Sequence, residues 1–187
     1  MKFETTSVVG AYLVHLDLRG DERGFFARVF CAQEFGDFGL VTNFVQFNTS
    51  LSVDPGTLRG MHYQARTSAE TKVVRCIKGA IFDVAIDLRK TSPSFGKFTA
   101  ARLDDINRDM LYVPKGCAHG FLTLEPNTEV LYFVDNFYHP GDERGVRFDD
   151  PTFAVPWPSF PSQISDKDRS WPNFDAANSI DEEWLKH

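Results

Sequence analysis

Short runs of β-branched and aromatic residues recur along the chain, and turn signals rich in Gly, Pro, Asn, Asp and Ser separate them. Such runs are typical of β-strands, because these side chains pack well on a pleated surface. Strands are predicted at residues 24–30, 43–53, 57–64, 72–78, 80–88, 97–103, 110–114, 119–124 and 129–138. The run at 80–88 alternates between two faces. One face carries Ile81, Asp83, Ala85 and Asp87, and the other carries Phe82, Val84 and Ile86. Many short, regularly punctuated strands indicate a sandwich or a barrel.

Helical signals are few. The segment AQEFGDFG at 32–39 predicts a short helix, and Ser179 and Glu182, at capping-box spacing, predict a helical turn over 179–187. The segment 149–161 is rich in Pro and contains Trp, so it cannot form a continuous central strand and is expected to wrap the body as an ordered loop. The sequence predicts one all-β domain over residues 1–187 with a few short helices.

The composition is that of an ordinary globular domain, with 187 residues, 42% hydrophobic and 25% charged. The 18 Phe residues are interpreted as core packing. The net charge of −6 provides no broad basic field, which argues against nucleic acid or an acidic membrane as a partner. A small anionic ligand remains compatible, because a few local Arg and Lys residues can hold it.

The three cysteines, Cys31, Cys76 and Cys117, are odd in number and include no CxxC pair. This pattern argues against a disulfide scaffold or a zinc site and favours a reducing compartment. The N-terminus lacks the apolar core of a signal peptide, and no apolar run has the length of a membrane span. A cytoplasmic location is expected.

Two histidines lie in predicted strands, His62 in TLRGMHYQ and His119 in YVPKGCAHGFLTL. Metal-binding cupins present His-x-His, but here Gln64 occupies the second position and is a poor ligand for a transition metal. His62, His119 and Glu70 could still hold Fe(II) as a facial triad, so spacing alone leaves a metal site open.

Without a metal, His62 can serve as a proton-transfer base, because histidine titrates near neutrality and a partner carboxylate fixes its tautomer. Arg59, Lys72 and Tyr132 lie on neighbouring predicted strands, and Asp168 follows late in the chain within QISDKDR. Ionisable groups on otherwise apolar strands are seldom needed for packing alone. The presence of these four ionisable residues therefore favours a catalytic role for His62 over a role in the core.

Eight segments follow one another as in a known family: GDERGFFARVF, QFNTS, GTLRGMHYQ, KVVRCIKGAIFDVAIDLRKTSPSFGK, YVPKGCAHGFLTL, EVLYFVDNFY, DERGVRFDDP and ISDKDR. From about residue 20 to residue 174 the chain resembles the dTDP-4-dehydrorhamnose 3,5-epimerases, which are RmlC-type cupin epimerases. The resemblance implies a cupin-type jelly roll (a double-stranded β-helix), no metal or other cofactor, a homodimer, and a nucleotide-sugar substrate, expected to be dTDP-linked.

The resemblance also assigns roles to individual residues. His62 matches the general base, Asp168 the carboxylate that orients it, Tyr132 the general acid, and Lys72 the lysine beside the ketone oxygen. Substrate-binding positions are matched by Arg23, Arg59, His119, Tyr138, Glu143 and Lys167, and the residues next to the nucleotide by Gln46 and Asn48. Of these, Arg23, Arg59 and Lys167 are expected to clamp the diphosphate.

The expected reaction is inversion of carbons 3 and 5 of a 4-keto-6-deoxy hexose, where the ketone acidifies both C–H bonds. Loss of a proton leaves an enolate oxygen for Lys72 to stabilise, and Tyr132, whose ordinary pKa is near 10, would supply a proton from the opposite face. Two alternatives remain: an enzyme that inverts one carbon or isomerises the ketone, and a noncatalytic binder of sugar nucleotides. The retained His62, Lys72, Tyr132 and Asp168 argue against the binder.

Two features do not fit the resemblance directly. Strict alternation places Arg59 and His62 on opposite faces of their strand, so either Gly60 marks a bulge or Arg59 reaches over the strand end. Arg28 and Phe47 replace the Glu of GFFxE and the Asp of QDN found in many family members. Both positions are expected near the nucleotide and sugar, so they bear on the identity of the substrate.

Overall fold

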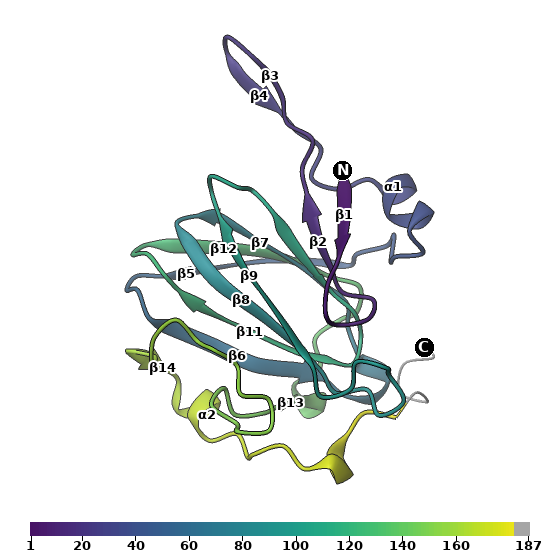
Figure 1. Cartoon of the computed structure of the whole chain (residues 1–187), viewed down its shortest axis with the longest axis vertical. Coiled ribbons are helices and arrows are strands. Elements are labelled where there is room, and N and C mark those ends of the chain that lie inside the picture. The colour runs from purple at the N-terminus through teal and green to yellow at the C-terminus, as the bar shows by residue number, and fades with distance from the viewer. Residues whose placement is uncertain (182–187) are drawn as a thin grey trace.

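Two β-sheets face each other in the computed structural model, which describes residues 1–181 (Figure 1). The six-stranded sheet contains, in spatial order, β1 (Lys2–Thr5), β2 (Tyr12–His15), β10 (Met110–Val113), β7 (Lys72–Lys78), β12 (Thr128–Val134) and β5 (Gln46–Ser52). The second sheet contains β13 (Glu143–Gly145), β6 (Thr57–Gln64), β11 (Cys117–Thr123), β8 (Ala80–Asp87) and β9 (Phe98–Asp104), and β14 (Gln163–Ile164) pairs with β6 in parallel. All other pairs are antiparallel, which confirms the all-β class.

The main core lies between the two sheets. Buried side chains from both sheets meet there, among them Val74, Ile81, Ala85, Leu111 and Phe121. The opposite face of β8 is buried as well, because Val84 and Ile86 pack against the C-terminal segment. The alternation predicted for this strand is confirmed. Burial of both faces explains why six of the eight residues of β8 are apolar.

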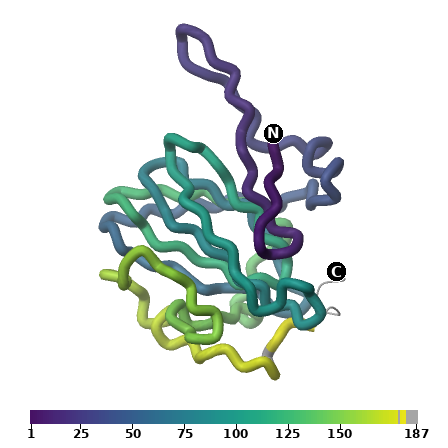
Figure 2. Tube along the Cα trace, in the orientation of Figure 1, coloured from purple at the N-terminus to yellow at the C-terminus, as the bar shows by residue number. Residues whose placement is uncertain are grey.

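The N-terminal region covers part of the outer face of the six-stranded sheet. Helix α1 (Ala32–Asp37) buries Phe35 against Val73 and Phe133 of that sheet. Between β2 and α1, a hairpin of β3 (Arg19–Asp21) and β4 (Gly24–Phe26) projects well beyond the body (Figures 1 and 2). The side chains of Phe25 and Phe26 are exposed on this hairpin.

The C-terminal segment runs along the second sheet, the one that contains β6 and β8, as its yellow-green trace shows in Figure 2. Residues 149–161 contain no helix or strand, bury Phe153 and pack Trp157 against the sheet, so the predicted ordered loop is confirmed. Helix α2 (Asp166–Arg169) follows, and three 3₁₀ turns occur at η1 (Arg66–Ser68), η2 (Pro140–Asp142) and η3 (Ala176–Asn178). Most of the helical turn expected over 179–187 lies outside the described residues.

The predicted strands agree closely with the observed ones where the runs are long: 57–64 and 72–78 match β6 and β7 residue for residue. The run at 24–30 ends early, at Phe26, because the chain leaves the hairpin there. The sequence missed β1, β2, β3, β13 and β14, which have two to four residues and are too short to show a period. Within residues 1–181 no helix combines the length and apolar character that crossing a membrane would require.

Candidate active site

A bulge in β6 brings Arg59 and His62 to the same side of the strand. His62 pairs with His119 of β11, and Arg59 pairs with Phe121, so Gly60 and Met61 together oppose the single residue Gly120. The extra residue resets the alternation, so of the two alternatives left open by the sequence the structure shows the bulge at Gly60. A side chain could not fit here, since a Cβ on Gly60, whose φ is +138°, would lie 2.5 Å from the Cα of Gly120.

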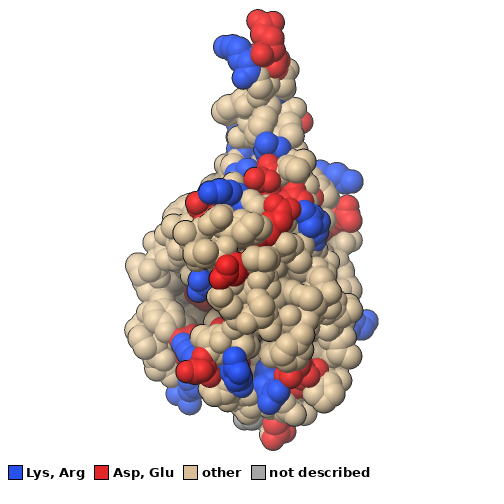
Figure 3. Space-filling model, turned by 90° about the vertical axis from the view of Figure 1, so that its left-hand side faces the viewer, with Lys and Arg blue, Asp and Glu red and all other residues tan. Residues whose placement is uncertain are grey.

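Between the sheets lies a cavity of about 790 Å³, which continues into a second space of about 370 Å³. Figure 3 shows a hollow in this side of the body, with charged side chains of both signs gathered around it. His62, Lys72 and Tyr132 line both spaces. Predicted site residues that line the first are Arg59, His119, Lys167 and Asp168, and those that line the second are Gln46, Asn48, Tyr138 and Glu143.

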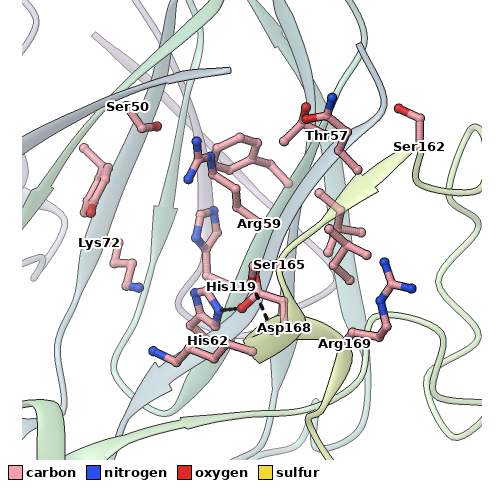
Figure 4. A pocket seen from close by; sticks show the side chains of 16 residues that line it. Ser50, Thr57, Arg59, His62, Lys72, His119, Ser162, Ser165, Asp168 and Arg169 are labelled. Atoms are coloured by element: carbon pink, nitrogen blue, oxygen red, sulfur yellow. Dashed lines mark hydrogen bonds and ion pairs between the residues drawn. The ribbon is translucent and has the colours of Figure 1, made fainter. Parts of the chain in front are cut away.

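His62 and Asp168 form a close pair at the centre of the site (Figure 4). Nε2 of His62 lies 2.6 Å from Oδ1 of Asp168, while Oδ2 accepts a bond from the backbone N–H of Gly60 at 3.3 Å. Burial of Asp168 opposes its ionisation, but hydrogen bonds from His62, Gly60 and Ser165 outweigh burial and hold the pKa of the carboxyl below its ordinary value. In the neutral imidazole the proton therefore lies on Nε2, and the basic lone pair lies on Nδ1.

Local sequence explains how Asp168 is held. Ser165 is the N-cap of α2, and its hydroxyl oxygen accepts a bond from the backbone N–H of Asp168 at 3.0 Å. The motif SDKD therefore begins the short helix α2, and this helix holds the Asp168 carboxylate in place. The ring of Trp171 packs edge-to-face against the ring of His62, with 6.2 Å between their centroids.

Lys72 and Tyr132 approach from the opposite wall. They belong to β7 and β12 of the six-stranded sheet, whereas His62 belongs to β6 of the other sheet. Figure 4 shows the Lys72 side chain across the cavity from His62 and His119. The Lys72 ammonium group forms an ion pair with Glu70 at 3.1 Å. The cavity therefore has an imidazole on one wall, and an ammonium group and a phenol on the other.

His119 forms a second histidine–carboxylate pair. Its Nε2 lies 2.8 Å from Oδ1 of Asp83, a residue of β8 with no exposed surface. The other oxygen of Asp83 is buried without a hydrogen-bond partner among the described residues. His119 itself lines the larger cavity, on the same side as His62.

Polar residues surround the remaining edges. Arg59 reaches toward β5, where its guanidinium donates to the carbonyl oxygen of Leu51 and to Oγ of Ser52. Glu143 accepts bonds from Lys167 at 2.5 Å and from the Tyr138 hydroxyl. Burial opposes ionisation of Glu143, but these two bonds outweigh it and keep its pKa below the ordinary value. The bond to Glu143 raises the pKa of Tyr138 to about 12.

Three residues that the sequence associated with the substrate do not line the cavity of their own chain. Arg23 sits at the end of the β3–β4 hairpin, 84% exposed, where it pairs with Asp21 and does not reach the cavity of its own chain. Phe47 points to the outer face of β5, 62% exposed, with its ring 4.8 Å from that of Phe133. Arg28 pairs with Glu34. The expectation that Phe47 and Arg28 lie near the pocket was therefore wrong for a single chain.

Sequence reasoning missed several residues of the site. Asp83 gave a usable signal, because a carboxylate on an inward-facing position of an apolar strand needs a buried partner. Glu70 was weighed only as a metal ligand, although it stands two residues before Lys72. Among the described residues no group of three His, Cys, Asp or Glu side chains is arranged to hold a metal ion. The three residues of the proposed facial triad are each paired with another side chain.

Comparisons with known proteins identify the family of the chain. The family profile of dTDP-4-dehydrorhamnose 3,5-epimerase matches residues 5–176. A relative of that name from Methanothermobacter thermautotrophicus is 43% identical over 173 residues, which cover 91% of this chain and 92% of the relative.

Two solved structures are similar over nearly their whole length. The dTDP-4-dehydrorhamnose 3,5-epimerase of Elizabethkingia anophelis superposes with a TM-score of 0.91 at 36% identity, covering 96% of this chain and 99% of its own. The Legionella pneumophila enzyme RmlC, in complex with dTDP-4-keto-L-rhamnose, superposes with a TM-score of 0.87 at 35% identity, and the match covers 98% of this chain and 96% of the enzyme. The fold is the cupin-type jelly roll expected from the sequence, and the chain belongs to the dTDP-4-dehydrorhamnose 3,5-epimerase family of isomerases.

Proposed function

We propose that this protein inverts carbons 3 and 5 of a nucleotide-linked 4-keto-6-deoxy hexose by removing a proton from one face of the ring and returning one to the other. The observation that carries the proposal is the placement of His62 and Tyr132 on opposite walls of one cavity, with Lys72 beside them. Inversion requires a base and an acid on opposite sides of a flattened intermediate.

In the proposed reaction Nδ1 of His62 accepts the proton from a carbon next to the ketone. The electron pair of the broken C–H bond forms an enolate, whose negative charge rests on the former ketone oxygen. The ammonium group of Lys72 stabilises that oxygen, and Asp168 stabilises the imidazolium. Tyr132 then donates its hydroxyl proton to the carbon from the other face, and the ketone re-forms. Exchange with water restores His62 and Tyr132 to their starting protonation states.

The proposed substrate is linked to dTDP. The diphosphate would be bound by Arg59 and Lys167, both of which line the larger cavity. Gln46, Asn48 and Tyr138 line the adjoining space and supply two amides and an aromatic ring for recognition of the sugar or the base. The complex of the Legionella pneumophila relative with dTDP-4-keto-L-rhamnose supports this choice of nucleotide.

The test is proton NMR of dTDP-4-keto-6-deoxyglucose incubated with the protein in heavy water. Deuterium at both carbons with formation of the inverted sugar would support the proposal. Deuterium at one carbon would identify a single-carbon epimerase, and movement of the keto group would identify a ketoisomerase. Absence of exchange despite tight binding of dTDP would identify a noncatalytic binding protein.

A homodimer is proposed as the working state. Apolar side chains remain exposed on the projecting hairpin, at Phe25 and Phe26, and on the outer face of β5, at Phe47 and Leu51. Arg23 can contact substrate only if its hairpin reaches the cavity of a second copy.

Mixing an Arg23→Ala variant with a His62→Ala variant tests this arrangement, because a mixed dimer would contain one site with both residues intact. Recovery of activity supports it, and continued inactivity of dimers that have demonstrably exchanged subunits contradicts it.

We also propose that the enzyme works in the cytoplasm. The three cysteines are free thiols, and burial raises the pKa of Cys76 to about 12. Such thiols suit a reducing compartment. Fractionation of the native cells, with immunodetection of the protein, is the direct check.

A further inference from the structure

Glu70 is a buried carboxylate that the proposed reaction does not use directly. Its Oε1 lies 3.1 Å from Nζ of Lys72, and the side chains of Glu70 and Lys72 are only 9% and 13% exposed. Both residues line the smaller part of the cavity, together with His62 and Tyr132. The ion pair is therefore part of the cavity wall and is largely shielded from solvent.

The backbone around Glu70 is held by the two residues that follow β12, the strand that carries the proposed acid. The N–H of Thr71 donates to Oδ1 of Asp135 at 2.6 Å, and Nδ2 of Asn136 donates to the carbonyl oxygen of Ala69 at 3.4 Å. Asp135 and Asn136 directly follow β12, which contains Tyr132. The position of the Glu70 carboxylate is thereby linked to the position of the phenol.

Lys72 needs such a partner for two reasons. Its ammonium group ends a flexible stem, and a cation in a largely enclosed site is costly unless it is paired. A second carboxylate, that of Glu143, also lines the smaller cavity and is bonded to Lys167 and Tyr138. Loss of the Glu70 charge would leave the Lys72 ammonium group free to move toward Glu143 and away from the position of the enolate oxygen.

We propose that Glu70 is a positioning residue that holds the Lys72 ammonium group where the enolate oxygen develops. One of the three N–H donors of Lys72 is used by Glu70, and the other two stay available to the substrate. The inference rests on the proposed epimerase function. It assigns Glu70 an effect on the chemical step that operates only through Lys72, with no contact to the nucleotide.

The test compares Glu70→Gln with Glu129→Gln. The control removes the same charge from another Lys–Glu pair of the same sheet, Lys78–Glu129, whose atoms are 3.8 Å apart on the exposed surface. Glu70→Gln is expected to slow deuterium exchange at carbons 3 and 5 on the order of 10- to 100-fold, since a displacement near 1 Å can have an effect of that size. The Kd for dTDP should change less than threefold, and the control should match the wild type in both measurements.

A double-mutant cycle with Lys72→Met separates positioning from a general structural role. If Glu70 acts through Lys72, adding Glu70→Gln to a folded Lys72→Met variant should change the exchange rate less than threefold. Additive effects would overturn the inference, and so would an exchange rate for Glu70→Gln equal to or above the wild-type rate. Absence of exchange in the wild type would instead refute the proposed function, so the two failures are distinguishable.

Discussion

Replacement of Asp168 by Asn tests the proposed base, because it preserves the shape of the side chain and removes its charge. The carboxylate is 6% exposed and lies 2.6 Å from Nε2 of His62. The variant loses the ionic partner of the imidazolium that forms when His62 accepts a proton. The Asn amide can also donate to Nε2, which would favour the tautomer with its proton on Nδ1, the atom that must act as base.

The structure supports an estimate of the loss. A hydrogen bond to a charged group contributes about 1.5–3 kcal/mol. At about 1.4 kcal/mol for each factor of ten, loss of imidazolium stabilisation alone lowers the rate roughly 10- to 150-fold. An Asp-to-Asn change in the catalytic triad of serine proteases, where the tautomer is also wrong, lowers kcat about 10⁴-fold. The expected decrease for Asp168→Asn is therefore about 10²- to 10⁴-fold.

The assay is the rate of deuterium incorporation at carbons 3 and 5, with Kd for dTDP and the thermal unfolding temperature as checks on the fold. Asp166→Asn is the matched control, because Asp166 lies in the same short helix and is exposed. That control should retain wild-type exchange. A folded Asp168→Asn protein that exchanges within about threefold of the wild-type rate would refute the role assigned to the pair.

Four further predictions follow from the site and the fold. His62→Ala should abolish exchange at both carbons, whereas Tyr132→Phe should retain exchange and lose net inversion, because abstraction does not need the acid; equal loss of both signals would contradict the assignment of Tyr132. Exhaustive chelation with EDTA should leave activity unchanged, since carboxylates occupy Nε2 of both cavity histidines; rescue by added metal would contradict this. Arg59→Ala should weaken dTDP binding roughly tenfold, because the side chain is exposed and its charge is partly screened; an unchanged Kd in titration calorimetry would exclude a diphosphate contact. Burial opposes ionisation of Asp87, but hydrogen bonds from Arg89, Ser92 and Ser94 hold its pKa in the folded state below the ordinary value of 3.8. The ionised carboxylate therefore stabilises the fold above pH 3.8, and this stabilisation is lost as the pH falls through the folded-state pKa. The difference in Tm between wild type and Asp87→Asn should accordingly shrink below pH 3.8.

The sequence determined most of the strand content and the chemical composition of the site. Strands β6 and β7 could be read residue for residue, because a run of branched and aromatic residues between turn signals is a local property. His62, Lys72, Tyr132 and Asp168 could be identified from motif order. Their types are those that the proposed reaction requires: a base, a cation, an acid and a carboxylate partner.

Only the tertiary structure decided which of these groups meet. The bulge at Gly60 depends on pairing with β11, which lies more than fifty residues later in the chain, so one strand alone cannot specify it. The outward direction of Phe47 follows from the register of β5 with β12. The ion pair of Glu70 depends on the segment before β7, which Asp135 and Asn136 hold by hydrogen bonds. Short strands such as β13 and β14 owe their extended form to pairing with β6, because two or three residues carry no periodic signal of their own.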